Sequence, residues 1–211
     1  MSPAGSADLL RSLVGEPYAA GRTLSGGLDP GTEVSGLDLE GCHIDGGVLE
    51  RTLWRQCTLA DCSVTGVNLS MSRFVEVRFS DCSVRDSKAQ AVSWTGVRSG
   101  GLAQRSLRFE RCRLDYGSFM GVDVRGMRFV SCSLVGADFA ESDCRDVEFV
   151  DCDLSGAQFS GADLRGALIA RARGVSLDLR EARTVGLRVD ASAALDLVVA
   201  MGVKIVDSPG G

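Results

Sequence analysis

The sequence lacks the features that mark membrane-spanning, exported and nucleic-acid-binding proteins. No run of about 18 apolar residues occurs, the length a transmembrane helix needs, and the N-terminus has no basic flank before a long apolar stretch. The net charge of -5 leaves no basic excess of the kind that general nucleic-acid binders carry. We therefore expect a cytoplasmic protein that binds neither a membrane nor nucleic acid directly.

A period of five residues runs through most of the chain. In steps of five from Leu24 to Val189, every position is apolar except Asp29, Ser99, Gln104, Gly174 and Thr184. Neither a helix, with its period of about 3.6, nor a strand, with its period of about 2, explains this spacing. All eight phenylalanines share the register: Phe74, Phe79, Phe109, Phe119, Phe129, Phe139, Phe149 and Phe159. Cysteine and alanine dominate the position two residues earlier, so we predict one inward column of large side chains and one of small side chains.

This pattern resembles the pentapeptide-repeat family, whose consensus reads Ala-(Asp/Asn)-Leu-x-x. Its clearest copies are Ala137-Asp138-Phe139 and Ala162-Asp163-Leu164, and the resemblance covers about residues 34–190. The resemblance implies an all-β solenoid, a right-handed quadrilateral parallel β-helix with four pentapeptides in each coil. The residues outside the repeat add the expectation of short helical caps at both ends. Every twentieth residue then lies above its predecessor, which places Cys42, Cys62 and Cys82 on one side and Cys112, Cys132 and Cys152 on the opposite side. Glycines that follow the large inward position by two residues are predicted at the corners, where a positive φ is needed.

Both ends of the chain depart from the repeat. Residues 1–33 are expected to form an N-terminal extension, in which Ser6 caps a short helix over residues 7–14 that covers the first coil. Residues 34–190 form the predicted β-helix, and residues 191–211 form a C-terminal helix and tail with Asp190 as the N-cap. The apolar residues Leu195, Val198 and Val199 exceed what the covering of one coil end requires. We predict that they pair two chains, with a simple cap as the alternative.

Residues 95–106 interrupt the repeat, with Ser99 and Gln104 at inward positions. The frame of five residues is the same before and after this segment. We therefore favour an irregular coil in register over a projecting loop, and leave both possibilities open.

The chain offers no constellation of catalytic or metal-binding residues. Its single histidine, His43, lies at an outward position and has no positioned nucleophile. The eight cysteines lie at inward positions, where packing explains them, and Cys57 and Cys62 are five apart rather than at the shorter spacing of zinc sites. Trp54 and Trp94 are expected to fill the core. We therefore expect no enzymatic activity, no cofactor and no metal.

Acidic residues concentrate between Ala137 and Leu154, where Arg145 is the single base. They are Asp138, Glu141, Asp143, Asp146, Glu148, Asp151 and Asp153, and we expect them to form an acidic face that binds a protein partner. A second acidic stretch lies between residues 29 and 61, and arginines outnumber acids between residues 98 and 128. The alternative is that the outward positions of any solenoid must be polar and that these acids have no partner.

The segment RTVGLRVD, residues 183–190, together with the helix that follows, is similar to the C-terminal end of mycobacterial MfpA-type pentapeptide-repeat proteins. Thr52-Leu53-Trp54 is similar to the same type. The resemblance to these and to Qnr-type proteins implies a DNA mimic that binds DNA gyrase or a related type II topoisomerase and protects against quinolones. It also implies a homodimer formed through the C-terminal end. The alternative is a non-enzymatic structural or protein-interaction scaffold without DNA mimicry.

Overall fold

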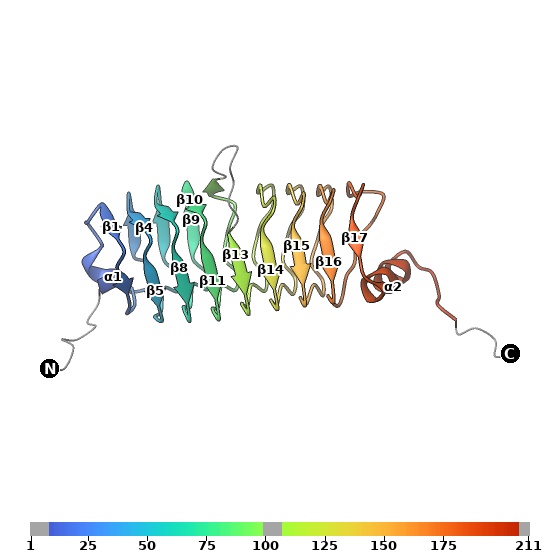
Figure 1. The fold of residues 1–211 in the computed structure, drawn as a ribbon, viewed down its shortest axis with the longest axis horizontal. Helices are drawn as coiled ribbons and strands as arrows, with labels where there is room; N and C mark the ends of the chain where they lie inside the picture. The colour runs from blue at the N-terminus through green and yellow to red at the C-terminus, as the bar shows by residue number, and fades with distance from the viewer. Residues whose placement is uncertain (1–8, 99–106, 207–211) are drawn as a thin grey trace.

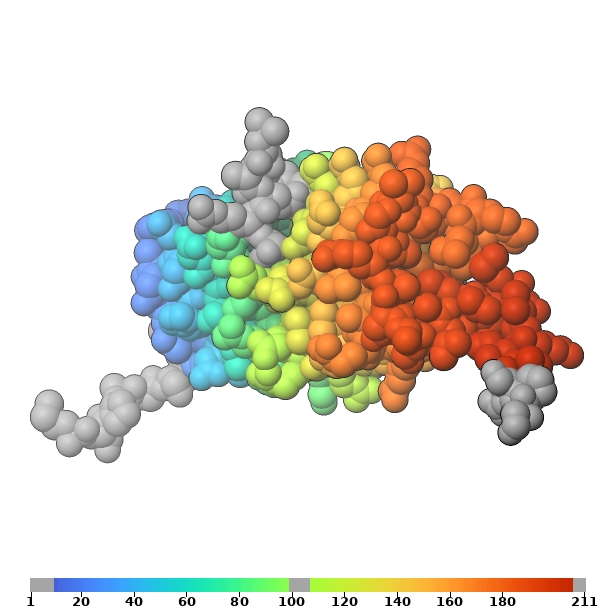
Figure 2. Space-filling model, turned by 45° about the vertical axis from the view of Figure 1, so that its right-hand side comes forward, coloured from blue at the N-terminus to red at the C-terminus, as the bar shows by residue number. Residues whose placement is uncertain are grey.

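The computed structural model describes residues 9–98 and 107–206. These residues wind into a four-sided parallel β-solenoid, a straight rod with a helix at each end (Figure 1). The coils follow one another along the rod as bands of successive colour (Figure 2). The predicted fold is confirmed, because strand after strand buries its central residue between two outward ones, as in Asp38–Glu40.

We number the four sides in the order in which the chain visits them. Side 1 holds β1 (Tyr18–Ala20), β4 (Asp38–Glu40), β7 (Thr58–Ala60), β10 (Val77–Ser80) and β12 (Val97–Arg98). Side 2 holds β2 (Thr23–Leu24), β5 (His43–Asp45), β8 (Ser63–Thr65), β11 (Ser83–Arg85), β13 (Arg108–Glu110), β14 (Arg128–Val130), β15 (Glu148–Val150), β16 (Leu168–Ala170) and β17 (Arg188–Val189). Side 4 begins with β3 (Glu33–Ser35), β6 (Leu53–Arg55) and β9 (Arg73–Val75). Isolated parallel bridges build side 3 and continue sides 1 and 4 toward the C-terminus.

Aromatic rings fill the C-terminal half of the core in two columns on opposite sides. Phe109, Phe129 and Phe149 stack on side 2, and Trp94, Phe119, Phe139 and Phe159 stack on side 4. Rings within a column are parallel, as in the pair Phe119 and Phe139 with centroids 4.6 Å apart, and rings of opposite columns meet edge to face. Offset-parallel and edge-to-face contacts are the favourable aromatic geometries, so the register of five residues determines the core.

One coil is longer than the others by one pentapeptide. On side 2 Val64 pairs with Val84, and Phe109 pairs with Phe129, which is the spacing of four pentapeptides that the resemblance implies. Val84 instead pairs with Phe109, one pentapeptide further along the chain than that spacing allows. The extra pentapeptide falls between Arg98 and Arg108. We expected an irregular coil in register over residues 95–106, and residues 99–106 of that segment lie outside the described ranges. The expectation of four pentapeptides in each coil is therefore wrong at this coil.

The longer coil also corrects the predicted arrangement of the cysteines. Cys42, Cys62 and Cys82 begin side 2, and Cys112, Cys132 and Cys152 begin side 3. The two sets therefore lie on adjacent sides rather than on opposite ones. The period of five itself is kept, which leaves every cysteine inward.

Helices cover both ends of the rod. α1 (Leu9–Ser12) begins where the described residues begin, and Leu10 and Leu13 are buried in the core. β1 pairs with β4, so the solenoid starts at Tyr18 and thus before the expected boundary at residue 34. α2 (Ala191–Ala200) begins after Asp190, whose carboxylate accepts a hydrogen bond from the Ala193 amide. In the described part of the chain no helix combines the length and the apolar character needed to cross a membrane.

The corners require backbone in the left-handed region. Glycine occupies many of them, for example Gly126 at φ 64° and Gly166 at φ 72°, as the sequence predicts. Fifteen other described corners carry a non-glycine residue with φ between 50° and 59°. Such a conformation costs an L-residue about 1–2 kcal/mol, and most of these corner residues are polar and exposed.

Candidate partner-binding surface

The seven acids predicted to form one face lie on all four sides of the rod. Asp138 is on side 4, Asp143 on side 1, Glu148 on side 2 and Asp153 on side 3, according to their bridge partners in neighbouring coils. Glu141, Asp146 and Asp151 occupy the corners between them. The acids form a ring around one coil, so the expectation of a single acidic face is wrong in its geometry.

Arginines neutralise four of the seven acids. Asp143 pairs with Arg145 at 2.7 Å and Glu148 with Arg128 at 2.7 Å. Asp151 pairs with Arg171 and Asp153 with Arg173, both at 2.6 Å. Asp138, Glu141 and Asp146 have no ion-pair partner among the described residues. The ring therefore presents fewer uncompensated charges than its composition suggests.

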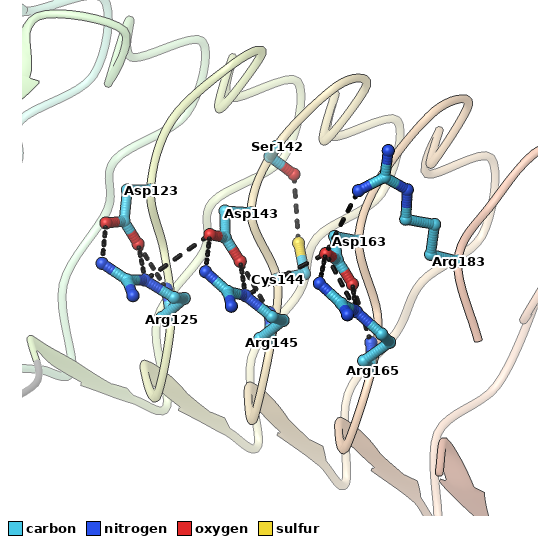
Figure 3. A network of polar contacts seen from close by, with 9 residues as sticks. All are labelled: Asp123, Arg125, Ser142, Asp143, Cys144, Arg145, Asp163, Arg165 and Arg183. Carbon is cyan, nitrogen blue, oxygen red and sulfur yellow. Dashed lines mark hydrogen bonds and ion pairs between the residues drawn. The ribbon is translucent and has the colours of Figure 1, made fainter. Parts of the chain in front are cut away.

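A repeated Asp-x-Arg unit forms the most regular polar feature of the surface (Figure 3). In one unit Asp143 Oδ1 accepts hydrogen bonds from the Arg145 amide at 3.3 Å and from Arg145 Nε at 2.9 Å. Asp143 Oδ2 accepts one from Arg145 Nη2 at 2.7 Å. The two outward side chains of one strand segment thus close a bidentate fork, the strongest ion-pair geometry available to arginine.

Three such units stack on side 1 in successive coils, at Asp123, Asp143 and Asp163 (Figure 3). Neighbouring units touch through Arg125 Nε and Asp143 Oδ2, 3.5 Å apart. Arg183 Nη1 lies 3.8 Å from Asp163 Oδ2 and adds a fourth arginine at the C-terminal end. This ladder carries three carboxylates and four guanidinium groups, so this part of side 1 is not acidic.

At two Asp-x-Arg units the arginine favours the charged form of the carboxylate. Hydrogen bonds from Arg165 hold the pKa of Asp163 below its ordinary value. The same fork at Asp178 and Arg180, outside the ladder, lowers the pKa of Asp178 to about 2. Sequence reasoning missed these units. An aspartate and an arginine two residues apart on an extended segment project from the same side, and the recurrence of this spacing from coil to coil was the available signal.

Uncompensated acids lie on the N-terminal half of the rod. Asp38, Asp45 and Asp61 are exposed and have no ion-pair partner in the part of the chain that the structure describes. They lie on side 1, on side 2 and at the corner between these sides, respectively. Glu40, on side 1, accepts a hydrogen bond from the Tyr18 hydroxyl at 3.0 Å. This region is the less neutralised part of the acidic surface.

The other residues considered as candidates in the sequence are the cysteines, His43 and the two tryptophans. All eight cysteines are buried free thiols, as their inward positions predict, and burial raises the pKa of the Cys144 thiol to about 12. His43 is exposed, and its Nδ1 lies 2.6 Å from Ser63 Oγ, a contact that sequence analysis did not anticipate. The described residues contain no group of three or more side chains that could hold a metal ion. Trp54 and Trp94 are buried in the core, as predicted.

The residues expected to pair two chains lie on the outer face of α2. Leu195 is 51% exposed, Val198 37% and Val199 56%, whereas Ala193 and Leu197 pack against the last coil. The capping contact of the helix therefore does not use these three apolar side chains.

Comparison with known proteins identifies the repeat. Residues 104–177 match the family model described as a pentapeptide repeat region. A search of curated proteins found no match. Among solved structures, the chain resembles two trypsin-treated forms of QnrB1, described as a plasmid-mediated fluoroquinolone resistance protein, at 16% identity each. One match covers 90% of this chain and 99% of the other with a TM-score of 0.61, and the second covers 90% and 97% with a TM-score of 0.58. The chain therefore contains a pentapeptide repeat region, and the four-sided solenoid that continues on both sides of it has the fold of the QnrB1 structures.

Proposed function

We propose that the chain is a DNA mimic that binds DNA gyrase or a related type II topoisomerase and protects it from gyrase-poisoning antibiotics. The observation that carries the proposal is a set of exposed carboxylates, on a narrow rod, that have no arginine partner among the described residues. They are Asp38, Asp45, Asp61, Glu141 and Asp146. Carboxylates held on a rigid rod complement the basic groove of a DNA-binding enzyme.

The dimensions of the rod support this proposal. The nine strands of side 2 span eight intervals of about 4.8 Å, or about 38 Å. Pairing of two chains through α2 would lengthen the rod into a continuous surface of the kind that a duplex offers. The likeness in fold to QnrB1, a fluoroquinolone resistance protein, favours the same class of function.

Gyrase supercoiling, measured with and without the purified protein, tests the proposal. We expect inhibition that weakens as salt rises, because exposed charges are screened by ions. The triple variant Asp38→Asn, Asp45→Asn and Asp61→Asn should inhibit about tenfold less, because steering by complementary charge is lost. The matched control Asp143→Asn, Asp151→Asn and Asp153→Asn removes the same net charge from paired positions and should have the smaller effect.

A non-enzymatic interaction scaffold is the second candidate. The Asp-x-Arg ladder favours it, because three carboxylates of side 1 are already neutralised by arginines of the same chain. The wild-type protein could prove to have no effect on supercoiling, on drug-stabilised cleavage or on drug susceptibility. That result would refute gyrase binding and favour the scaffold function.

A further inference from the structure

One corner of the rod carries apolar side chains where polar ones are the norm. Of the fifteen described non-glycine residues with positive φ, twelve are polar or charged, and the other three are Met71, Ala91 and Tyr116. All three lie on the corner between sides 3 and 4 in consecutive coils. The Met71 amide donates to the Gln90 carbonyl, and the Ala91 amide donates to the Asp115 carbonyl, both at 2.8 Å. Folding does not require an apolar row at positions that favour glycine and face solvent.

The side chain of Tyr116 lies exposed on this corner. This side chain is 67% exposed, and its ring lies across Gly136 in the next coil. A Cβ at Gly136 would lie 2.8 Å from ring atoms Cδ1 and Cε1 of Tyr116. The Tyr116 ring can therefore occupy this position only because residue 136 has no side chain. Met71, 41% exposed, lies on the same corner two coils before Tyr116, and Met120, 50% exposed, lies on side 4 of the coil that contains Tyr116.

Basic side chains flank the apolar row. We name Met71, Ala91, Tyr116 and Met120, together with Arg73, Lys88 and Arg113, the edge patch. Arg73 and Lys88 are exposed and have no ion-pair partner among the described residues. Within residues 67–75, 87–95 and 112–120, the coil segments that form the patch, Asp115 is the one acid.

The charge of Asp115 faces the protein rather than the patch surface. Asp115 is 5% exposed, and its carboxylate accepts hydrogen bonds from Gln90 Nε2 at 2.9 Å, from Ser133 Oγ and from the Val135 amide at 3.3 Å. Arg113 Nη2 lies 3.7 Å from its Oδ2. The exposed charges of the edge patch itself are thus all positive, in a chain with a net charge of -5. The half-buried Asp138, beside Ser118 in the next coil, lies at the border of the patch.

We propose that the edge patch docks an acidic, amphipathic segment of a partner protein. Tyrosine, methionine and arginine are the residues enriched at protein interfaces, and flexible methionines adapt to apolar side chains of different shape. The three exposed bases select carboxylates on the partner by charge complementarity. Single-stranded nucleic acid fits less well, because its binding platforms stack several successive aromatic rings, whereas Tyr116 is one ring between aliphatic neighbours. This inference does not depend on the proposed function, which uses carboxylates outside the edge patch.

Methyl NMR of the full chain with ¹³C-labelled methionine tests the proposal. The probe is an 18-residue amphipathic peptide of leucine and glutamate, compared with the same peptide carrying lysine in place of glutamate and with oligothymidylate. We expect the glutamate peptide to shift the Met71 and Met120 signals saturably, and the shifts to diminish at high salt. The signals of buried Met127 and of Met201, which is exposed on the C-terminal cap, should not move. Equal shifts at Met201, equal binding of the lysine peptide, preferential binding of oligothymidylate, or no shift at all would each overturn the proposal.

Two variants separate docking from folding. Lys88→Glu should weaken binding of the glutamate peptide at least tenfold, whereas the same substitution at Lys204, in the exposed C-terminal tail, should leave it unchanged. Tyr116→Gly should also abolish binding while the protein stays folded, because Gly136 and Gly156 already occupy this corner at φ 64° and 70°. Unchanged binding by Tyr116→Gly, or equal effects of the two lysine substitutions, would contradict the assignment of this surface.

Discussion

Val84 pairs with Phe109, one pentapeptide further along the chain than the pairing of Val64 with Val84 predicts. Because the insertion is itself a whole pentapeptide, the inward residues stay inward on both sides of the longer coil. The insertion instead moves each later residue back by one side of the rod. This shift places Phe109, Phe129 and Phe149 on side 2, opposite the column of Trp94 and Phe119. The longer coil therefore determines that Trp94 stacks on Phe119 and meets Phe109 edge to face.

A charge inside an aromatic column should unfold much of the rod. Phe139 is fully buried between Phe119, at 4.6 Å, and Phe159, at 5.2 Å. Loss of a buried phenylalanine costs about 3–5 kcal/mol, and a buried unpaired carboxylate adds to that cost. We expect Phe139→Asp to lower the free energy of unfolding by at least this amount in denaturant titrations. Gln158→Asp, at an outward position in the next coil, should change it by less than about 0.5 kcal/mol. Wild-type stability of Phe139→Asp would show that the register is wrong.

The period of five residues could be read from the sequence because each inward position repeats a physical requirement. Every fifth side chain must fill the core, and the eight phenylalanines satisfy that requirement without exception in register, although Phe79 is only partly buried. The number of pentapeptides in a coil does not alter the pattern of apolar residues in the sequence. An extra pentapeptide preserves the pattern of apolar residues and changes only which residues stack, so the sequence alone places Cys112 on the wrong side. The acids around Asp143 fail to form one face for a different reason, because successive pentapeptides occupy successive sides of the rod.

Corner residues show a second limit of sequence reasoning. Glycine marks a corner, but a corner with arginine, methionine or tyrosine looks like any other outward position. The stacked coils supply the hydrogen bonds that hold such residues at positive φ, for example from the Tyr116 amide to the Val135 carbonyl at 2.9 Å. Tertiary structure thus overrides the local preference of these residues.

Replacement of a strained corner residue by glycine should stabilise the protein. Ala91 is exposed at φ 52°, where an L-residue is unfavourable and glycine is not. After allowance for the greater freedom of glycine in the unfolded chain, we expect Ala91→Gly to raise the free energy of unfolding by about 0.5–1 kcal/mol. Ala140→Gly, at a position without positive φ, should lower it by about 0.5–1 kcal/mol. Thermal or denaturant unfolding measures both free energies. A loss of stability in Ala91→Gly would contradict the inference that the backbone of Ala91 is strained.

The Asp-x-Arg fork should be visible in the titration of its carboxylate. Hydrogen bonds from Arg180 lower the pKa of Asp178 to about 2, against about 3.9 for a free aspartate. Because the folded pKa lies below the unfolded one, the contribution of the pair to stability is present above about pH 4 and is lost as the pH falls toward 2. Carboxyl ¹³C NMR should give this low value for the wild type. Arg180→Gln should return the pKa toward about 3.9 and leave Asp163, which pairs with Arg165, unchanged. A wild-type pKa near 3.9 would mean that the fork opens in solution.

The C-terminal helix leads to a prediction about assembly. α2 uses Ala193 and Leu197 to cover the last coil, which leaves Leu195, Val198 and Val199 exposed on its outer face. Met201, Val203 and Ile205, each more than half exposed, continue the apolar surface beyond the helix. A contiguous exposed apolar surface of this kind marks an interaction site in soluble proteins. We expect two chains to pair about a two-fold axis through this surface, which is the commonest symmetric arrangement.

Substitutions on the outer face of α2 test this pairing without disturbing the cap. Leu195→Glu with Val199→Glu should give a folded monomer, because both side chains are exposed and like charges would then meet across the two-fold axis. Ser192→Glu, at an exposed position in the first turn of the same helix, should remain a dimer. Light scattering at micromolar concentration measures the mass, and far-UV dichroism confirms that the solenoid is intact. If the full-length wild-type chain is itself a monomer under these conditions, α2 only caps the rod, and any partner must bind a single rod about 38 Å long rather than a doubled one.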